Sequence, residues 1–373
     1  MRQRSMWLIV ILAAAFGSCS RPSLPVSAAN APLSSRLDRA HVLACLGAPP
    51  DAIYEPERLA APPEPGLSVH TFDQEVSRCG TVRRRYLSYV PTSLAARSTA
   101  PVLIVLHGQG ASAEAMMSFQ THGTFNRLAD AKGLVVIYGN GLPTSLNFAG
   151  LLNSGRWRSE PEVNPSGIDD VGYLDRIAGD LLARGVIAGG NDLYLIGQSN
   201  GGGMALRAAR ERPEAYAGVA AFMPFVGFSP SPPPHLEHTR LRRVMFVYSY
   251  ADPGLPPSYT DNVLVPLGQA WAGALGLGTS DGLDDVATAL PNVVTEGQGQ
   301  ETDAAAVRAT RASSGQRLDR RREDRAFRQL VFDRAGHFWP TRQPADPDRV
   351  LVKFGLRNQD VEGATEVAAF FLD

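Results

Sequence analysis

A serine, an aspartate and a histidine stand far apart in this sequence, and each follows a short apolar run. Together their side chains can perform nucleophilic acyl transfer, because an imidazole can take the hydroxyl proton while a carboxylate orients the imidazole. We therefore predict a serine nucleophile, a histidine base and an orienting acid. They are Ser199 after residues 193–196, His337 after residues 330–332 and Asp252 after residues 244–248.

The segment Gly-Gln-Ser-Asn-Gly around Ser199 lies between an apolar run and a helix-like run that includes Met204. A strand, a tight turn and a helix in this order hold a serine in a strained conformation at the edge of a sheet. Gly197 and Gly201 suit that turn because a side chain at either position would collide with the strand or the helix. The alternative is a glycine-rich turn with an incidental serine.

Two backbone N–H groups are expected to bind the oxyanion of a tetrahedral intermediate. Asn200 provides one at a helix N-terminus, and Gln109, in the Leu-His-Gly-Gln-Gly segment after residues 102–106, provides the other. Asp333 lies too near His337 to orient it, and the remaining acids and histidines considered suit helix starts or irregular, polar segments. These are Asp169, Asp170, Asp261, His41, His70, His122, His235 and His238.

Apolar runs of strand length alternate with segments of helical periodicity, which predicts a mostly parallel sheet covered by helices on both faces. Because the carboxyl ends of parallel strands meet at one edge of a sheet, this arrangement would bring the three side chains together. The expected strands are 85–91, 102–106, 134–138, 193–196, 219–225, 244–248 and 329–332, and the helices lie within 37–46, 112–132, 173–183, 200–212, 264–277 and 366–372.

Residues 278–325 fit this pattern poorly and are expected to form one mobile insertion before the last strand. Their second half is polar and rich in arginine. Asp319, Glu323 and Asp324 balance part of this charge locally, which favours a solvated surface over a docking patch for an anionic polymer. The arginines are Arg308, Arg311, Arg317, Arg320, Arg321, Arg322 and Arg325.

The composition is that of an ordinary globular protein, with 44% hydrophobic residues, 20% charged residues and a net charge of −1. This balance and the scattered aromatic residues argue against binding to nucleic acid. We predict neither a cofactor nor a metal site, since no Cys-x-x-Cys motif or His/Cys cluster is present. The oligomeric state is not predicted.

The first residues resemble an export signal, with Arg2 and Arg4 before an apolar run that is too short to span a bilayer. Its end resembles a lipobox, in which Cys19 would be lipidated and attach the protein to a membrane of the cell envelope; plain secretion is the alternative. We divide the chain into a signal peptide (1–19), a Pro/Ala-rich tether and irregular arm (20–66), and a catalytic domain (67–373). Once exported, Cys45 and Cys79 are expected to form a disulfide rather than remain two buried thiols.

The motifs together resemble the secreted polyhydroxybutyrate depolymerase and feruloyl esterase branch of the α/β-hydrolases. The resemblance covers most of 82–373 outside the insertion, and it implies the same catalytic residues, Ser199, Asp252 and His337. The matching segments are 85–91, 106–108, 169–173 (Asp-Asp-Val-Gly-Tyr), 197–202, 251–253 and 336–340 (Gly-His-Phe-Trp-Pro).

The chain departs from this group at Gln109 and Ser249-Tyr250, so its substrate preference cannot be transferred from the group. His107, Trp157, Tyr250 and Trp339 are the candidate substrate contacts, although Trp157 could equally fill the core. We expect an exported α/β-hydrolase that cleaves a polyester or its oligomers. The alternatives are a feruloyl- or acetyl-type carbohydrate esterase, a hydrolase of a poly-aspartate-like polyamide, and a non-catalytic, polymer-binding lipoprotein.

Overall fold

The fold is taken from a computed structural model that describes most of the chain from residue 36 onward. The described residues are 36–48, 52, 54, 64–77, 79–94, 99–143, 155–160, 167–188, 192–227, 230, 233–236, 238–250, 252–278, 284–293, 313–332, 335–342 and 361–373. The expected signal peptide with Cys19, most of the tether, and Arg308, Arg311 and Asp333 lie outside them.

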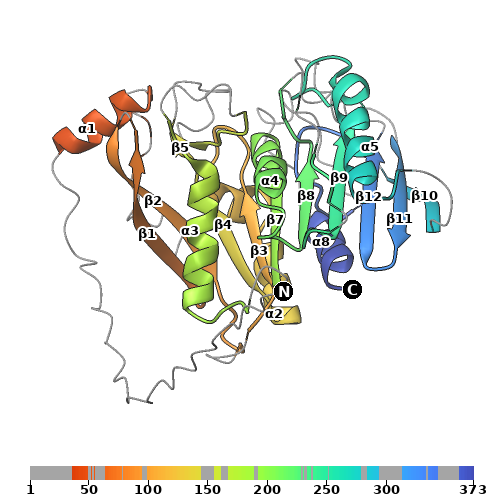
Figure 1. The fold of residues 1–373 in the computed structure, drawn as a ribbon, viewed down its shortest axis with the longest axis horizontal. Helices are drawn as coiled ribbons and strands as arrows, with labels where there is room; N and C mark the ends of the chain where they lie inside the picture. The colour runs from red at the N-terminus through yellow and green to blue at the C-terminus, as the bar shows by residue number, and fades with distance from the viewer. Residues whose placement is uncertain are drawn as a thin grey trace, which may run out of the picture.

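A ten-stranded twisted sheet runs through the molecule in the order β1-β2-β4-β3-β7-β8-β9-β12-β11-β10 (Figure 1). The six strands from β4 to β12 in this order are parallel, whereas β1, β2, β11 and β10 pair antiparallel at the two ends. The strands of this sheet are β1 (Leu67–Val76), β2 (Gly80–Tyr89), β3 (Val102–Leu106), β4 (Val135–Gly139), β7 (Leu193–Gln198), β8 (Gly218–Phe222), β9 (Arg243–Ser249), β10 (Asp284–Val293), β11 (Ser313–Arg322) and β12 (Arg325–Phe332).

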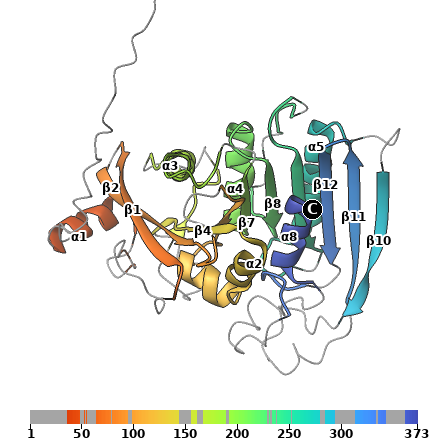
Figure 2. The same ribbon diagram turned by 90° about the horizontal axis from the view of Figure 1, so that it is seen from below.

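Helices cover both faces of the sheet, as Figure 2 shows. On one face lie α3 (Asp170–Ala183), α4 (Asn200–Glu211) and α5 (Val265–Ala274), with the π-helical turn η3 (Thr260–Leu264) leading into α5. On the other lie α2 (Thr124–Lys132) and α8 (Gly363–Leu372), and the π-helical turn η1 (Ala115–Gln120) precedes α2. The fold is therefore the α/β-hydrolase fold predicted from the sequence.

The central strands consist of apolar residues because they are buried on both faces. Val102–Leu106 and Val135–Gly139 are buried along their whole length, and alternate residues of each contribute to the cores on opposite faces. Burying a large aliphatic side chain contributes about 1.5–3 kcal/mol. These strands therefore form a rigid base whose carboxyl ends carry the loops of the site.

A smaller core joins the N-terminal helix α1 (Arg36–Cys45) to the first hairpin. Cys45 and Cys79 form the expected disulfide, which closes a sequence separation of 34 residues. Leu43, Tyr54 and Val82 are buried beside it, together with Leu142 of the short strand β5 (Leu142–Pro143). The N-terminal arm thus packs against a loop that leads toward the functional site.

The segment expected to be an irregular insertion contains two strands of the sheet. β10 and β11 pair with each other, and β11 pairs with β12 in an antiparallel register. Charged residues obscured β11 in the sequence. Asp319 of this strand forms ion pairs with Arg317 and with Arg328 of β12, where an apolar surface would have been recognised. Within the described residues, the arginine-dense segment is therefore part of the sheet, mostly on β11 beside the edge strand β10.

Among the described residues, no helix is both long and apolar enough to cross a membrane.

Candidate active site

The structure brings the three predicted side chains into one chain of hydrogen bonds. His337 Nε2 lies 2.7 Å from Ser199 Oγ, and His337 Nδ1 lies 2.8 Å and 3.0 Å from the two carboxylate oxygens of Asp252. An ionised carboxylate can only accept, so Nδ1 carries the proton and Nε2 is free to accept the serine proton. The arrangement is that of a nucleophile, a base and an orienting acid.

Each of these residues follows a parallel strand and is therefore at the same edge of the sheet. Ser199 follows β7, Asp252 follows β9 and His337 follows β12, and β12 pairs directly with β9 in parallel. The side chains of Asp252 and His337 are 1% and 8% exposed, so little water competes for their hydrogen bond.

The turn at Ser199 has the strained geometry expected from its glycines. Ser199 has φ 53° and ψ −123°, a region that L-residues rarely occupy. A Cβ at Gly197 would lie 2.1 Å from the Gly201 carbonyl oxygen, and a Cβ at Gly201 would lie 2.4 Å from the His107 carbonyl oxygen. Only glycine permits the strand, the turn and α4 to approach this closely.

Two residues that the sequence did not single out hold the base and the acid in place. Gln198 donates from Nε2 to the His337 carbonyl oxygen at 3.1 Å. Gly254 donates its N–H to Asp252 Oδ1 at 2.8 Å, and a Cβ at Gly254 would lie 2.3 Å from His337 Cγ. A glycine two residues after the acid is thus needed for the imidazole to fit, a requirement that only the contact reveals.

Both expected oxyanion donors lie beside the nucleophile. Gln109 and Asn200 line the cavity that contains Ser199, and Asn200 is the first residue of α4, where the helix dipole favours negative charge. A Cβ at Gly108 would lie 3.3 Å from Ser199 Cβ, so the loop after β3 packs directly against the nucleophile. The N–H groups of these two residues are the candidates to bind an oxyanion.

His107 is fully buried and does not line this cavity, which corrects the expectation of a substrate contact. The Gly141 N–H donates to His107 Nε2 at 3.0 Å, so Nδ1 carries the proton and donates to the Gly108 carbonyl oxygen at 2.7 Å. Burial lowers the pKa of His107 to about 4 and keeps its ring neutral. The buried ring of His107 therefore supports the Gly108–Gln109 loop through its hydrogen bonds to Gly108 and Gly141.

Trp157 is also buried and does not line the cavity of Ser199, consistent with the core-filling alternative. Its backbone N–H donates to Asn200 Oδ1 at 2.7 Å, and Asn200 Nδ2 donates to its carbonyl oxygen at 3.1 Å. The Asn200 side chain is committed to these contacts, so its backbone N–H, at the start of α4, is the candidate group for an oxyanion.

Trp339 and Tyr250 do not line the cavity of Ser199 either, although both lie close in sequence to the triad. Trp339 is fully buried, and its ring stacks on Phe222 with centroids 3.8 Å apart. Tyr250 is 50% exposed and is not part of the cavity lining, and its ring lies edge-on to Tyr248. Sequence proximity predicted a position near the site, but it did not predict the direction of these side chains.

The cavity over Ser199 has a volume of about 360 Å³ and mainly apolar walls. The loop after β8 supplies Phe225, the loop after β9 supplies Leu255 and Pro256, and Phe338 follows the histidine. These four are ordinary apolar residues, so they gave little signal in the sequence. The remaining lining residues are Gly108, Gln109, Ala111, Gln120, Gln198, Ser199, Asn200, Pro253, Gly254 and His337.

The polar groups of this cavity are amides, the serine hydroxyl and the imidazole. Within the part of the chain that the structure describes, no three His, Cys, Asp or Glu residues gather where they could hold a metal ion. The chemistry that this arrangement can perform unaided is acyl transfer through Ser199.

No family model matches the chain. A curated protein of Nocardia uniformis subsp. tsuyamanensis, named "Putative esterase NocK", is 32% identical over 195 residues, which is 52% of this chain and 52% of that protein. The chain thus matches about half the length of this curated relative.

Similar solved structures include a thermostable esterase, with 19% identity, a TM-score of 0.41, and coverage of 57% of this chain and 52% of that one. Acetyl xylan esterase from Aspergillus awamori is 14% identical, with a TM-score of 0.46. The match covers 74% of this chain and 95% of the esterase chain. The strand order, the strained turn at Ser199 and the position of each site residue after a parallel strand together identify the architecture: this chain has the α/β-hydrolase fold and resembles a curated esterase over half its length.

Proposed function

We propose that this protein is a serine hydrolase that cleaves carboxylic esters through a covalent acyl-enzyme. The observation that supports this most directly is the unbroken chain of hydrogen bonds from Asp252 through His337 to Ser199. The similarity to a curated esterase supports the same bond class.

In the first half of the reaction, Ser199 Oγ attacks the ester carbonyl carbon while His337 Nε2 takes its proton. The developing oxyanion is bound by the N–H groups of Asn200 and Gln109. The intermediate then collapses as the bond to the alcohol breaks, and His337 returns the proton to the leaving alkoxide.

In the second half, water attacks the acyl-enzyme and gives its proton to His337. The bond between the acyl carbon and Ser199 Oγ breaks, and the proton passes from His337 to the serine. Asp252 holds the imidazole in the required tautomer throughout and stabilises its positive charge.

The substrate we propose has an uncharged, mainly apolar acyl group. Phe225, Leu255 and Phe338 form apolar walls, and no lysine, arginine, aspartate or glutamate lines the described cavity. A polyester such as poly-3-hydroxybutyrate, or its oligomers, has this chemistry, and a feruloyl- or acetyl-type carbohydrate ester is the alternative.

An anionic polyamide receives less support from the arrangement of charges. Of the arginines that could attract it, Arg317 is paired with Asp319 and Glu366, and Arg325 with Glu323. None of the described arginines lines the cavity of Ser199.

We also propose that the protein is exported and attached to the cell envelope through a lipidated Cys19. The Cys45–Cys79 disulfide supports export, because such bonds persist in oxidising compartments. Treatment with a lipoprotein signal peptidase inhibitor tests the attachment: accumulation of an unprocessed precursor is expected, and unchanged processing contradicts it.

Labelling with a fluorophosphonate tests the proposed activity. We expect one label per wild-type chain, no label on Ser199→Ala, and unchanged labelling of Ser68→Ala, which alters an exposed serine on β1. Equal labelling of Ser199→Ala would refute the assignment. Turnover of p-nitrophenyl esters, polyhydroxybutyrate film, methyl ferulate and poly-aspartate then ranks the substrates. Polymer binding with no turnover of any activated ester would instead indicate a non-catalytic binding protein.

A further inference from the structure

A short segment, residues 155–159, is hydrogen-bonded both to Asn200 and to the loop that contains Gln109. It begins in strand β6 (Gly155–Arg156), which pairs with β5. The Gly110 N–H donates to the Gly155 carbonyl oxygen, and the Gly155 N–H donates to the Ala111 carbonyl oxygen, both at 2.9 Å. The 155–159 segment is thereby bound to the loop that contains Gln109.

The same segment is bound to the nucleophile turn on its other side. Asn200 exchanges two hydrogen bonds with the Trp157 backbone, and its Nδ2 also donates to Ser159 Oγ at 2.9 Å. Trp157 Nε1 donates to the His107 carbonyl oxygen at 2.9 Å. One segment therefore links the two residues whose N–H groups must converge on the oxyanion.

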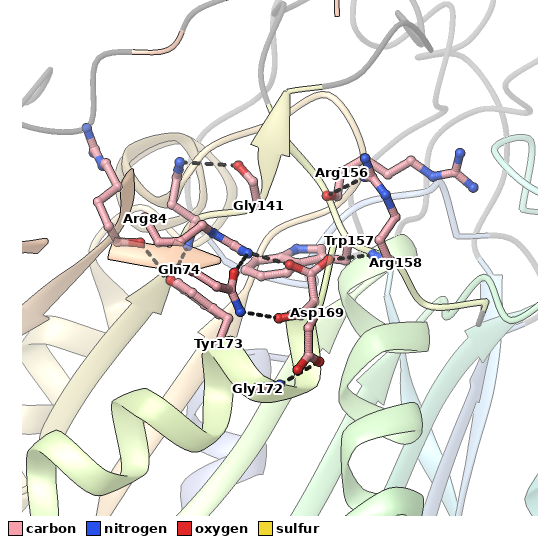
Figure 3. Close-up of polar contacts among 12 residues, drawn as sticks. Gln74, Arg84, Gly141, Arg156, Trp157, Arg158, Asp169, Gly172 and Tyr173 are labelled. Atoms are coloured by element: carbon pink, nitrogen blue, oxygen red, sulfur yellow. Dashed lines mark hydrogen bonds and ion pairs between the residues drawn. The ribbon is translucent and has the colours of Figure 1, made fainter. Parts of the chain in front are cut away.

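A buried carboxylate, Asp170, also holds this segment. Asp170 accepts the Arg158 N–H at Oδ2 and Arg84 Nη2 at Oδ1, each at 2.7 Å. The side chains of Asp170 and Arg84 are both fully buried. Arg84 in turn donates to Gln74 and lies 4.1 Å from the centre of the Tyr173 ring, and Figure 3 shows these three side chains close together near the N-terminus of α3.

Tyr173 connects this group of residues to the backbone that holds His107. Its hydroxyl donates to the Arg85 carbonyl oxygen at 2.7 Å and accepts the Asn140 N–H at 2.9 Å. The next residue, Gly141, donates its N–H to His107 Nε2. The Asp-Asp-Val-Gly-Tyr motif thus reaches the oxyanion loop by two routes, one through Arg158 and one through Asn140.

We propose that Asp170, paired with Arg84, is a positioning residue that aligns the two oxyanion donors through the 155–159 segment. This inference rests on the proposed ester hydrolase function. Asp170 touches neither the substrate nor the triad. Its role is to keep the Arg158 N–H, and with it Trp157 and Gly155, at a fixed place relative to Asn200 and Gln109.

Removal of the carboxylate leaves one buried N–H without its acceptor and one buried guanidinium without its counter-charge. Both losses, at Arg158 and at Arg84, are strongly unfavourable in a dry interior. We expect the 155–159 segment to shift in response. A displacement of about 1 Å in a catalytic group can lower the rate about 100-fold.

The test compares Asp170→Ala with Asp319→Ala. Asp319 also pairs with a buried arginine, Arg328, but it does so beneath α8 and contacts no part of the 155–159 segment. We expect both variants to melt at lower temperature. Only Asp170→Ala should lose kcat, by about 100-fold, with KM changed less than about threefold, because the loss concerns the transition state.

A boronic acid inhibitor provides a readout that a purely structural role would not change. Its adduct with Ser199 places a boron-bound oxygen between the oxyanion donors, so its Ki should rise with Asp170→Ala by about the same factor as kcat falls. Fluorophosphonate titration gives the concentration of folded active sites. Because kcat is calculated from that concentration, unfolded protein does not lower its value. An unchanged Ki, or equal kcat losses in Asp170→Ala and Asp319→Ala, would overturn the proposal.

A double variant, Arg84→Met with Asp170→Ala, keeps the test decisive if the single variant does not fold. Removing both charges relieves the unpaired guanidinium, but the Arg158 N–H still lacks its acceptor. We expect stability to recover and kcat to stay low, whereas recovery of both would show that the pair serves stability alone. Failure of the proposed function appears differently, as wild-type protein that neither reacts with fluorophosphonate nor turns over esters.

Discussion

The neutral ring of His107 makes the protein sensitive to acid, and the size of the effect follows from its burial. The pKa of His107 falls from its ordinary value of 6.5 to about 4 because burial disfavours the charged ring. The unfolded chain therefore binds this proton below pH 6.5, whereas the folded protein binds it only below about pH 4. The contribution of His107 to the free energy of unfolding is therefore complete above pH 6.5, and it is lost as the pH falls from 6.5 towards 4.

Between pH 7.5 and pH 4.5 this linkage lowers the free energy of unfolding by about 2.5 kcal/mol. The comparison with His107→Gln separates the effect of His107 on stability from the effects of the other titrating groups. The glutamine can still accept the Gly141 N–H, but it does not titrate. In urea unfolding at the two pH values, we expect the wild type to lose about 2.5 kcal/mol more than the variant.

His70→Gln is the matched control. Burial also lowers the pKa of His70 to about 4, but His70 bonds Ser88 and stacks on Tyr86 at the far end of the sheet. We expect its loss to reduce acid sensitivity without changing kcat at pH 7.5, whereas His107→Gln should also lower kcat by disturbing the Gly108–Gln109 loop. A difference between wild type and His107→Gln below about 0.5 kcal/mol, or an NMR titration of the His107 ring near pH 6.5, would refute the reasoning.

Two further predictions concern the acid of the triad and the disulfide. Asp252→Asn should lower kcat about 10⁴-fold in steady-state ester hydrolysis, because the amide favours the wrong tautomer of His337; a loss below tenfold would contradict the assigned role. Replacing Cys45 and Cys79 by serine should lower the free energy of unfolding by about 4 kcal/mol, as expected for a cross-link between residues separated by 34 positions. Urea unfolding measures this, and an unchanged midpoint in the oxidised and the cysteine-free proteins would contradict it.

The residues of the triad could be found in the sequence because each follows an apolar strand and the three occur in a known order. The parallel sheet converts that order into proximity, as the 2.7 Å contact between Ser199 and His337 shows. The disulfide was likewise predictable, because only Cys45 and Cys79 remain once Cys19 is assigned to the leader.

The walls of the cavity and its supports could not be predicted in the same way. Trp339 follows His337 by two positions, yet its ring stacks against Phe222 in the core, since the direction of a side chain depends on backbone torsions that composition does not encode. Asp170 has the sequence signature of a helix start, which it indeed occupies as the first residue of α3. Its second role depends on Arg84, 86 positions away, and only the folded chain brings them together.

The backbone of Ser199 carries a consequence for how such a protein changes over time. Its φ of 53° costs on the order of 1–3 kcal/mol, which the surrounding structure must offset. A glycine in its place would relieve this strain and abolish the nucleophile. A more stable but inactive protein therefore differs from this one by a single substitution. Only selection for catalytic activity retains the serine.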